Sequence, residues 1–335
     1  MKLVTYELTQ ADGRVEKVGV FYNKEQYVID ALAATALYLA RNEEVSRPYN
    51  IAQAYIGKTM LELIEGGNGA LNLLKKVLSY VKPLLDTNIT LKGIKDDTIA
   101  FKLTEVKLLA PLNPSSMRDG LNCYEHFKNL LKVKNLDTVP ELFSKRPFYY
   151  RGNHFSVSGP DSVVPWPSYG SRMDFELEIF AILGKAGENI PIDKAMDHIF
   201  GYTIFNDFTA RNQQPEDSAT TLGPSKCKCF TGGNAIGPCI VTADDLPNPG
   251  NLHMQARING EKWSDNNTNE MLFSFAEMIA YISQDEKLYP GECIASGTMS
   301  FGAGQEMGKF LEDGAKVELE VEGIGILRNI IKRIQ

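Results

Sequence analysis

Residues 174–184 of the chain read Asp174-Phe175-Glu176-Leu177-Glu178-Ile179-Phe180-Ala181-Ile182-Leu183-Gly184. Apolar residues recur there at every second position, which is typical of a β-strand with one buried face. The other face begins with acids and then changes to Phe180 and Ile182. A face that met only solvent would stay polar along its length. We therefore expect Glu176 and Glu178 to lie where the surface turns inward.

Two neighbouring carboxylates in a partly buried place repel each other and lose hydration unless a cation compensates them. Glu176 and Glu178 are two residues apart on one strand face, so both can reach a single ion. The pattern favours a site for a hard divalent cation, which prefers oxygen ligands. The alternative is a solvated strand face, because paired acids are common on exposed sheets.

The composition excludes several classes of protein. The 335 residues carry a formal net charge of -7, which argues against broad nucleic-acid binding. There is no run of roughly 20 apolar residues that would span a membrane, and the first residues lack the apolar core of a signal peptide. The five cysteines form no disulfide framework or paired zinc pattern. We expect a cytoplasmic enzyme with neither nucleic acid nor membrane as a partner.

The chain is long enough for about two domains, and the pattern of predicted helices and strands changes near residue 108. Short strands over 2–8, 15–21 and 27–29 precede a helix with leucines at helical spacing, which Pro83 is expected to close. We predict a strand over 104–109 and a boundary marked by Pro111 and Pro114. Residues 1–108 are therefore expected to form a small N-terminal α+β domain.

Residues 109–335 are expected to be mainly β, with turns rich in glycine and proline. Asn259-Gly260 is a hairpin signal, and the apolar spacing over 271–283 predicts a helix. The segment 211–225 has few apolar residues and is expected to be a mobile polar loop.

Several motifs follow one another in this part of the chain. They are Arg118-Asp119 with His126, Ser158-Gly159-Pro160, Asp174-Phe175-Glu176-Leu177-Glu178, Asn206-Asp207-Phe208-Thr209-Ala210-Arg211, Leu222-Gly223-Pro224, Lys228-Cys229-Phe230, Ile236-Gly237-Pro238 and Ser296-Gly297-Thr298. In order and spacing the series resembles the fumarylacetoacetate hydrolase family, over residues ~110–335. The resemblance implies a mixed β-sandwich roll for this domain and a homodimeric assembly.

The resemblance also implies a set of metal ligands. It adds Asp119 and Asp207 to Glu176 and Glu178, around Mg²⁺ with Mn²⁺ or Ca²⁺ as alternatives. Asp207 follows an apolar strand over 202–205, where a third ligand can sit. Its alternative role is to cap a helix that starts at Phe208.

The catalytic residues implied by the family are His126, Glu306 and Lys228. The histidine matches the general base that activates water, and Glu306 is the best match for its orienting carboxylate. Lys228 would stabilise negative charge as a C–C bond breaks, although Lys226 competes for this role. The alternative for His126 is a structural role, and the alternative for Lys228 is a solvated cation.

Arg211 and Gln214, with Lys228, match positions that face the substrate in the family. Tyr150 and Asn153 fall near the family's substrate loop, and Thr298 is expected to hydrogen-bond a substrate oxygen. A guanidinium suits the carboxylate of a keto acid. The alternatives are a solvated cation for Arg211, packing for Tyr150 and a turn for Thr298. Substrate choice is expected to depend on residues 127–155 and 211–225.

The implied function is hydrolysis of a C–C bond in a 1,3-dicarbonyl acid, fumarylacetoacetate- or acylpyruvate-like, in aromatic or keto-acid catabolism. The alternatives are a 2-keto acid hydratase or dehydratase, isomerase or decarboxylase on the same site, and a binding protein without catalysis. Another branch of the family carries N-Y-x-x-H-x-x-E, where this chain has Cys123 and Asn129 at the tyrosine and glutamate positions. The mechanism of that branch is therefore not transferred.

Overall fold

The computed structural model describes residues 1–10, 13–133, 135–136, 138–219 and 221–334. These residues form two compact units, Met1–Leu112 and Asn113–Gln335. None of the helices within the described ranges combines the length and the apolar character needed to cross a bilayer. All five cysteines are free thiols.

The N-terminal unit pairs an antiparallel sheet with four helices. Its strands are β1 (Lys2–Gln10), β2 (Gly13–Tyr22), β3 (Tyr27–Asp30) and β4 (Ala100–Lys102), in the order β4-β3-β2-β1, with β5 (Lys107–Leu108) against β1. Its helices are α1 (Ala31–Asn42), α2 (Pro48–Ile56), α3 (Met60–Glu65) and α4 (Gly67–Thr87). Asp30 caps α1 by accepting from the Ala33 N–H, as an aspartate before a helix is suited to do.

Two predictions for this unit need correction. Pro83 does not close its helix but lies inside α4, which continues to Thr87. Proline removes one backbone donor, yet buried Leu85 extends the apolar stripe and anchors the next turn. The strand predicted over 104–109 shrinks to β5, because residues Leu103–Glu105 form a 3₁₀ turn.

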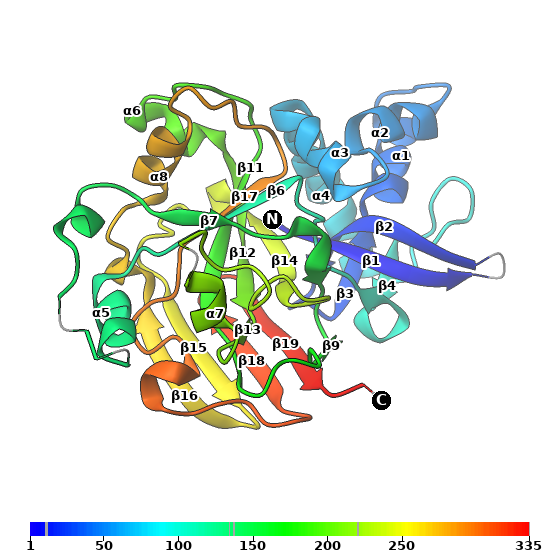
Figure 1. Ribbon diagram of the computed structural model, residues 1–335. Coiled ribbons are helices and arrows are strands. Elements are labelled where there is room, and N and C mark those ends of the chain that lie inside the picture. Colours follow the sequence, from blue (N-terminus) through cyan, green and yellow to red (C-terminus); the bar gives the residue numbers. More distant parts are fainter. Residues whose placement is uncertain (11–12, 134, 137, 220, 335) are drawn as a thin grey trace. The chain divides into compact units, whose positions relative to one another are not determined.

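The C-terminal unit contains two sheets that pack face to face (Figure 1). The first has the order β14-β12-β11-β17-β6-β7, with β8 beside β14, and the second has the order β16-β15-β18-β19-β9. The first comprises β14 (Asn234–Thr242), β12 (Ile199–Asp207), β11 (Leu177–Leu183), β17 (Glu292–Ala295), β6 (Ser116–Gly120), β7 (Tyr149–Arg151) and β8 (Val157–Ser158). The second comprises β16 (Glu261–Asn267), β15 (His253–Ile258), β18 (Lys316–Val321), β19 (Gly325–Lys332) and β9 (Ser162–Pro165).

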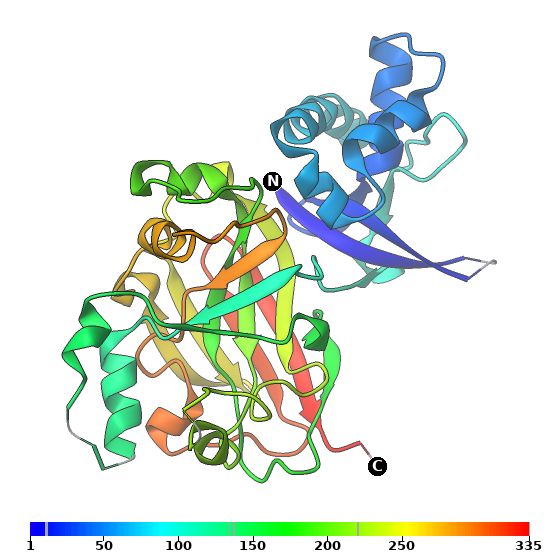
Figure 2. The same ribbon diagram turned by 45° about the horizontal axis from the view of Figure 1, so that its top comes forward.

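The contacts between β14 and β19 and between β12 and β18 join these two layers, which Figure 2 shows from another side. β11, β12 and β14 are buried along their whole length, which explains their nearly continuous apolar sequences. This mixed arrangement agrees with the fold expected from the sequence. It also shows that the regular strand begins at Leu177, after the short β10 (Met173–Asp174), which pairs with β13 (Thr209–Ala210).

Short helices complete the unit, namely α5 (Tyr124–Val133), α6 (Ile192–Ala195), α7 (Gln214–Ser218) and α8 (Phe275–Ile282). The hairpin prediction is confirmed, since Asn259-Gly260 connects β15 and β16. The helix predicted over 271–283 begins only at Phe275, because Ser274 caps it through a reciprocal pair of bonds with Glu277. The predicted loop over 211–225 contains α7.

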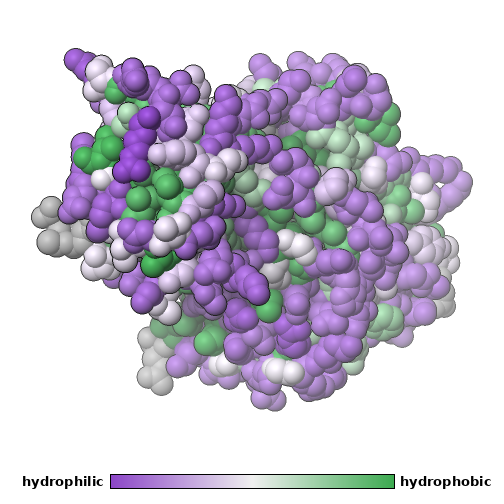
Figure 3. Space-filling model, turned by 180° about the vertical axis from the view of Figure 1, so that it is seen from behind, coloured by the Kyte–Doolittle hydropathy of each residue, from purple (hydrophilic) through white to green (hydrophobic). Residues whose placement is uncertain are grey.

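On the face shown in Figure 3, hydrophilic residues predominate and hydrophobic residues form several separate groups. Such a mixed surface is usual, because a folded chain cannot cover itself with polar groups alone.

Candidate active site

Three buried acids come together from β6 and from the start of β11, two strands of the first sheet with β17 between them. Asp119 lies on β6, Glu178 on β11, and Glu176 directly before β11. One carboxylate oxygen from each lies within 4.8 Å of the others. This spacing suits oxygen ligands around one cation.

Several carboxylate oxygens in this region lack a polar partner. Asp119 Oδ1, Glu178 Oε2 and Asp207 Oδ1 are buried, and no hydrogen-bond donor among the described residues reaches them. A buried acceptor left unpaired costs free energy, and a buried charge costs more. A divalent cation would compensate these groups, so the donor set fits one with a preference for oxygen.

The pKa values of the acids show the same imbalance. Burial, together with the charges of Glu176 and Asp207, raises the pKa of Glu178 to about 8. Burial and the charge of Glu178 raise the pKa of Asp119 well above its usual range. Burial would also raise the pKa of Glu176, but Lys228 and Arg211 lower it to about 2. Glu176 therefore stays ionised, whereas Glu178 and Asp119 need a further positive charge to ionise fully.

Asp207 ends β12 and starts no helix, so the capping alternative does not apply. Its Oδ2 accepts from the Tyr150 hydroxyl at 2.6 Å and also from Lys228 Nζ. The oxygens within 4.8 Å of one another belong to the other three acids, and Asp207 interacts with Asp119 beside them. Asp207 thus adjoins the cluster with one oxygen still unpaired.

Lys228 is buried and surrounded by oxygens. Its Nζ donates to Glu176 Oε2 at 2.5 Å and to Thr209 Oγ1 at 3.0 Å, besides Asp207. Burial would lower the pKa of Lys228, but Asp207 and Glu176 outweigh burial and raise it. The ammonium group therefore stays charged. Lys226 is exposed and lies over the Tyr169 ring, so Lys228 is the lysine that the structure brings to the site.

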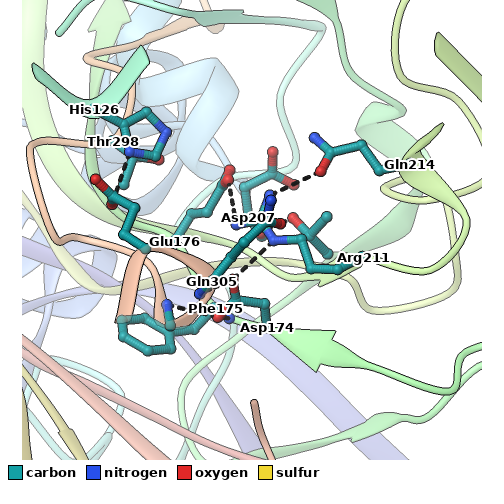
Figure 4. Close-up of polar contacts among 12 residues, drawn as sticks. His126, Asp174, Phe175, Glu176, Asp207, Arg211, Gln214, Thr298 and Gln305 are labelled. Carbon is teal, nitrogen blue, oxygen red and sulfur yellow. Dashed lines mark hydrogen bonds and ion pairs between the residues drawn. The ribbon is translucent and has the colours of Figure 1, made fainter. Parts of the chain in front are cut away.

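Arg211 is buried between two acids, as Figure 4 shows. Its Nε donates to Asp174 Oδ2 at 2.8 Å, and a terminal nitrogen donates to Glu176 Oε1 at 2.7 Å. The other terminal nitrogen lies 3.2 Å from Gln214 Oε1. Two arms of the guanidinium are thus used to hold Glu176 and Asp174. Among the described residues of the pocket wall are Gln214 and Glu176 but not Arg211, so the structure places Arg211 behind the wall, where it holds these residues.

His126 lies on α5 and is the only buried residue among the described ones of that helix. Its Nδ1 lies 2.8 Å from Glu306 Oε2. Glu306 Oε1 accepts from Asn129 Nδ2 and from the Phe301 N–H, each at 3.0 Å. The carboxylate is thereby fixed, and a proton on Nδ1 leaves Nε2 as the acceptor.

Thr298 donates to Glu178 Oε1 at 2.8 Å and faces the pocket. It follows Gly297, whose φ of +73° lies in the left-handed region. A Cβ on Gly297 would collide with the carbonyl oxygen of Gly120, on the strand parallel to β17. Only glycine fits this crossing, which explains the residue before Thr298.

A pocket with a volume of about 830 Å³ opens over these groups. From the residues singled out in the sequence, it is lined by Asp119, His126, Tyr150, Glu176, Glu178, Gln214, Lys228 and Thr298. The described residues of the pocket wall do not include Asn153, which caps a 3₁₀ turn instead, nor His154, whose ring packs on Phe155. The site is therefore a cavity beside two groups of side chains. One is the carboxylate cluster of Asp119, Glu176 and Glu178, and the other is the pair of His126 and Glu306.

Comparison with known proteins identifies the family. A model of the fumarylacetoacetate (FAA) hydrolase C-terminal domain matches residues 115–332. The chain belongs to the fumarylacetoacetate hydrolase family. The match covers all the residues of the carboxylate cluster and the histidine–glutamate pair, so the family expected from the sequence is confirmed.

The curated relatives are similar over most of the chain. An uncharacterized protein of Staphylococcus aureus (strain USA300) is 38% identical over 244 residues, which are 71% of this chain and 76% of that protein. The name of that protein states no activity.

Solved structures share the fold at lower identity. A fumarylacetoacetate hydrolase from Exiguobacterium antarcticum is 23% identical, with a TM-score of 0.70 over 99% of this chain and 100% of that one. A maleylpyruvate hydrolase from Sphingobium has 20% identity and a TM-score of 0.69, and a 5-carboxymethyl-2-hydroxymuconate delta-isomerase from Mycobacterium smegmatis has 21% and 0.66. Both alignments cover the two chains completely. The fold is thus that of an enzyme family with both hydrolases and isomerases.

Two residues of this family member were not assigned to the site from its sequence. Asn129, which replaces a glutamate of another branch, instead supports Glu306. Asp174, which the sequence marked only as an acid beside the two glutamates, accepts from the Gly304 and Gln305 N–H groups as well as from Arg211. Its position before the strand gave no signal for either bond.

Proposed function

We propose that the protein is a metal-dependent hydrolase that cleaves a C–C bond in a 1,3-dicarbonyl acid of the acylpyruvate type. The reaction adds water to the distal carbonyl of a 2,4-dioxo acid and yields a carboxylic acid and a 2-oxo acid. The pairing of His126 with Glu306 beside the carboxylate cluster supports this proposal most, because hydrolysis needs a base for water next to a site that binds the dicarbonyl.

Asp119, Glu176 and Glu178, with Asp207 beside them, would hold the cation. The ion would be Mg²⁺ by preference, and when bound it would supply Lewis-acid polarisation of the substrate oxygens. The unpaired oxygens of Asp119 and Glu178 support this assignment.

His126 is proposed as the general base. With its Nδ1–H directed to Glu306, Nε2 can take a proton from water as that water adds to the distal carbonyl. The C–C bond then breaks, its electron pair passes to the departing 2-oxo acid, and a proton replaces the acyl group. Glu306 keeps the imidazole in the required tautomer and stabilises it once it is charged.

Lys228 is proposed to stabilise the negative charge that develops on the departing fragment. Its charge is secured by Glu176 and Asp207, so it acts as a cation and not as a base. Tyr150 keeps its proton, because burial and Asp207 raise the pKa of its hydroxyl group well above the usual range. Its hydroxyl group orients Asp207.

An isomerase or hydratase could use the same carboxylates, and of the solved relatives one is named an isomerase and another a hydrolase. The His126–Glu306 pair favours a reaction that consumes water, which isomerisation and decarboxylation do not. Hydration also consumes water, so the products must separate it from hydrolysis. The test is to incubate the purified protein and Mg²⁺ with acetylpyruvate and its longer homologues, and to identify products. A pair of carbon fragments supports the proposal, whereas an intact carbon skeleton contradicts it.

A further inference from the structure

One part of the pocket wall is apolar and has no role in the chemistry proposed above. It is formed by five half-buried side chains from α5 and from the segments that flank it, namely Leu121, Phe127, Leu130, Leu131 and Phe148. Three of these recur on α5 at positions i, i+3 and i+4, so they share one face of the helix. That face is turned to the cavity and is only half covered by protein.

The apolar wall is backed by a packed aromatic cluster. Phe143 is buried, and its ring lies 4.6 Å from the ring of Phe127 and 6.3 Å from that of Phe148, measured between centroids. Aromatic pairs at these distances attract each other beyond simple burial. The wall is therefore held in place before a ligand arrives.

A further apolar residue lies at the same pocket on the segment after α7. Leu222 is 90% exposed and lines the cavity together with Pro224. Most large exposed apolar residues need no explanation, but this one lies at a cavity that already has an apolar wall. An apolar group of a ligand would shield both Leu222 and the apolar wall from water.

The cations of the pocket do not favour a second acidic group on the ligand. Among the described lining residues, the lysine and arginine side chains are Lys228 and Arg151. Lys228 is held between Glu176 and Asp207. Arg151 is 65% exposed, so solvent screens its charge, and it pairs at 2.7 Å with Glu286, which Arg118 also contacts. A second carboxylate at the end of the acyl tail would lie against the apolar wall, where its loss of hydration is costly.

We propose that the site selects a monocarboxylic 2,4-dioxo acid whose acyl group ends in an unbranched alkyl chain or a phenyl ring, and discriminates against dicarboxylic substrates of the same length. The inference rests on the proposed function, because it assigns the substrate class of that reaction. The dioxo acid part belongs at the carboxylate cluster, and the acyl tail belongs at the apolar wall.

The expected effect follows from the burial of methylene groups. Each one transferred from water to an apolar wall gives about a fourfold gain in binding. The ratio kcat/KM should therefore rise about fourfold per methylene from acetylpyruvate to hexanoylpyruvate, until the wall is covered. The analogue that ends in a carboxylate at the same length should react much more slowly.

The experiment measures kcat/KM of the full-length protein with Mg²⁺ for this series and for the matched dicarboxylic acids. A rise with chain length together with poor use of the dicarboxylic acids supports the inference. A flat series, or a preference for the dicarboxylic acids, overturns it while leaving the proposed function intact.

A variant pair separates recognition by the wall from general damage. Leu131→Lys places a cation on the wall and should shift the preference toward dicarboxylic acids by roughly tenfold or more, since an ion pair replaces an apolar contact. The matched control is Val133→Lys, on the same helix but exposed and outside the pocket wall. It should keep the wild-type preference. Equal preferences in both variants would overturn the inference.

If the protein cleaves none of the series, the proposed function fails and a binding assay decides the inference. Calorimetry with Mg²⁺ and 2-oxo acids of increasing chain length supplies it. Dissociation constants that fall with each methylene support an apolar tail site, and constants independent of chain length overturn it.

Discussion

His126 Nδ1 lies 2.8 Å from Glu306 Oε2, and both side chains are almost entirely buried. The bond fixes the imidazole on α5 to the 3₁₀ turn Gly304–Met307, although 180 residues separate the two positions. A buried carboxylate in this position orients the imidazole and fixes which ring nitrogen faces the pocket. The pair is therefore the proposed base that activates water.

Replacement of His126 by alanine should lower kcat by about 10²–10⁴-fold, the range of a positioned general base. Glu306→Gln should lower kcat in the same direction and change the pH profile, because the glutamine no longer stabilises a charged imidazole. Steady-state kinetics over pH 5–9 measure both effects.

The control for these variants is His253→Ala. His253 is exposed and pairs with Asp265 at the surface, and it does not line the pocket. Full activity in His126→Ala, or an equal loss in His253→Ala, would refute the assignment of the base.

Glu178→Gln should have opposite effects on stability and on metal affinity. Without metal, the substitution removes a carboxylate whose ionisation is opposed by burial and by its acidic neighbours, so the melting temperature at pH 8 should rise. With Mg²⁺, one ligand is lost and the affinity should fall by at least about tenfold.

Differential scanning fluorimetry and calorimetry measure the two effects of Glu178→Gln. Glu188→Gln serves as the control, because that glutamate is exposed and should change neither quantity. A Glu178→Gln protein that binds Mg²⁺ as tightly as the wild type would rule Glu178 out as a ligand.

The stability of the metal-free protein should fall as the pH rises from about 5 to 8. The pKa of Glu178 is raised to about 8 in the fold, above its value of about 4.3 in an unfolded chain. The folded state therefore binds the proton more tightly, and the stability that this provides is lost as the pH rises through the folded pKa. Glu176, with its pKa of about 2, does not titrate in this window.

Thermal melts from pH 5 to 9, with and without Mg²⁺, check this expectation. The metal should raise the melting temperature more at pH 8 than at pH 6, because protons compete for the same oxygens. A Glu178→Gln variant should show a weaker dependence on pH. A stabilisation by Mg²⁺ that is larger at pH 6 would contradict the proposed ligand set.

Asp174 joins both parts of the site, since it accepts from Arg211 on one side and from the turn that carries Glu306 on the other. Asp174→Asn leaves the Arg211 guanidinium buried with one charged partner fewer. A loss of about 3–5 kcal/mol in the free energy of unfolding is expected, as for other broken buried pairs. Metal affinity and kcat should fall together, because Arg211 holds Glu176.

Urea denaturation, calorimetry with Mg²⁺ and steady-state kinetics test Asp174→Asn. The exposed Asp265→Asn variant is the control and should leave the free energy of unfolding close to that of the wild type. If Asp174→Asn affected kcat but left metal affinity unchanged, the link through Arg211 to Glu176 would be wrong.

The local pattern of the sequence predicted the features that depend on neighbouring residues. Alternation over residues 174–184 indicated that Glu176 and Glu178 face inward, and both are buried. The placement of Asp207 at a strand end and the Asn259-Gly260 hairpin rest on equally local signals. The family resemblance added the long-range pairing of His126 with Glu306.

Features that depend on distant packing could not be predicted in this way. Asp174 meets Arg211 and Gly304 across 37 and 130 residues, and no sequence period encodes such contacts. Asn129 supports Glu306 across 177 residues, so its role is visible only in the fold. Pro83 remains inside α4 because tertiary burial of Leu85 outweighs its poor helix propensity.

The most direct test of the proposed function follows the fate of the carbon skeleton. Hexanoylpyruvate labelled with ¹³C at its two ketone carbons is incubated with the protein and Mg²⁺ in H₂¹⁸O. The products are observed by NMR and mass spectrometry. We expect pyruvate and hexanoate, with ¹⁸O from water in the hexanoate carboxylate, and turnover by His126→Ala lowered by about 10²–10⁴-fold. A product that keeps both labelled carbons in one molecule would contradict hydrolysis.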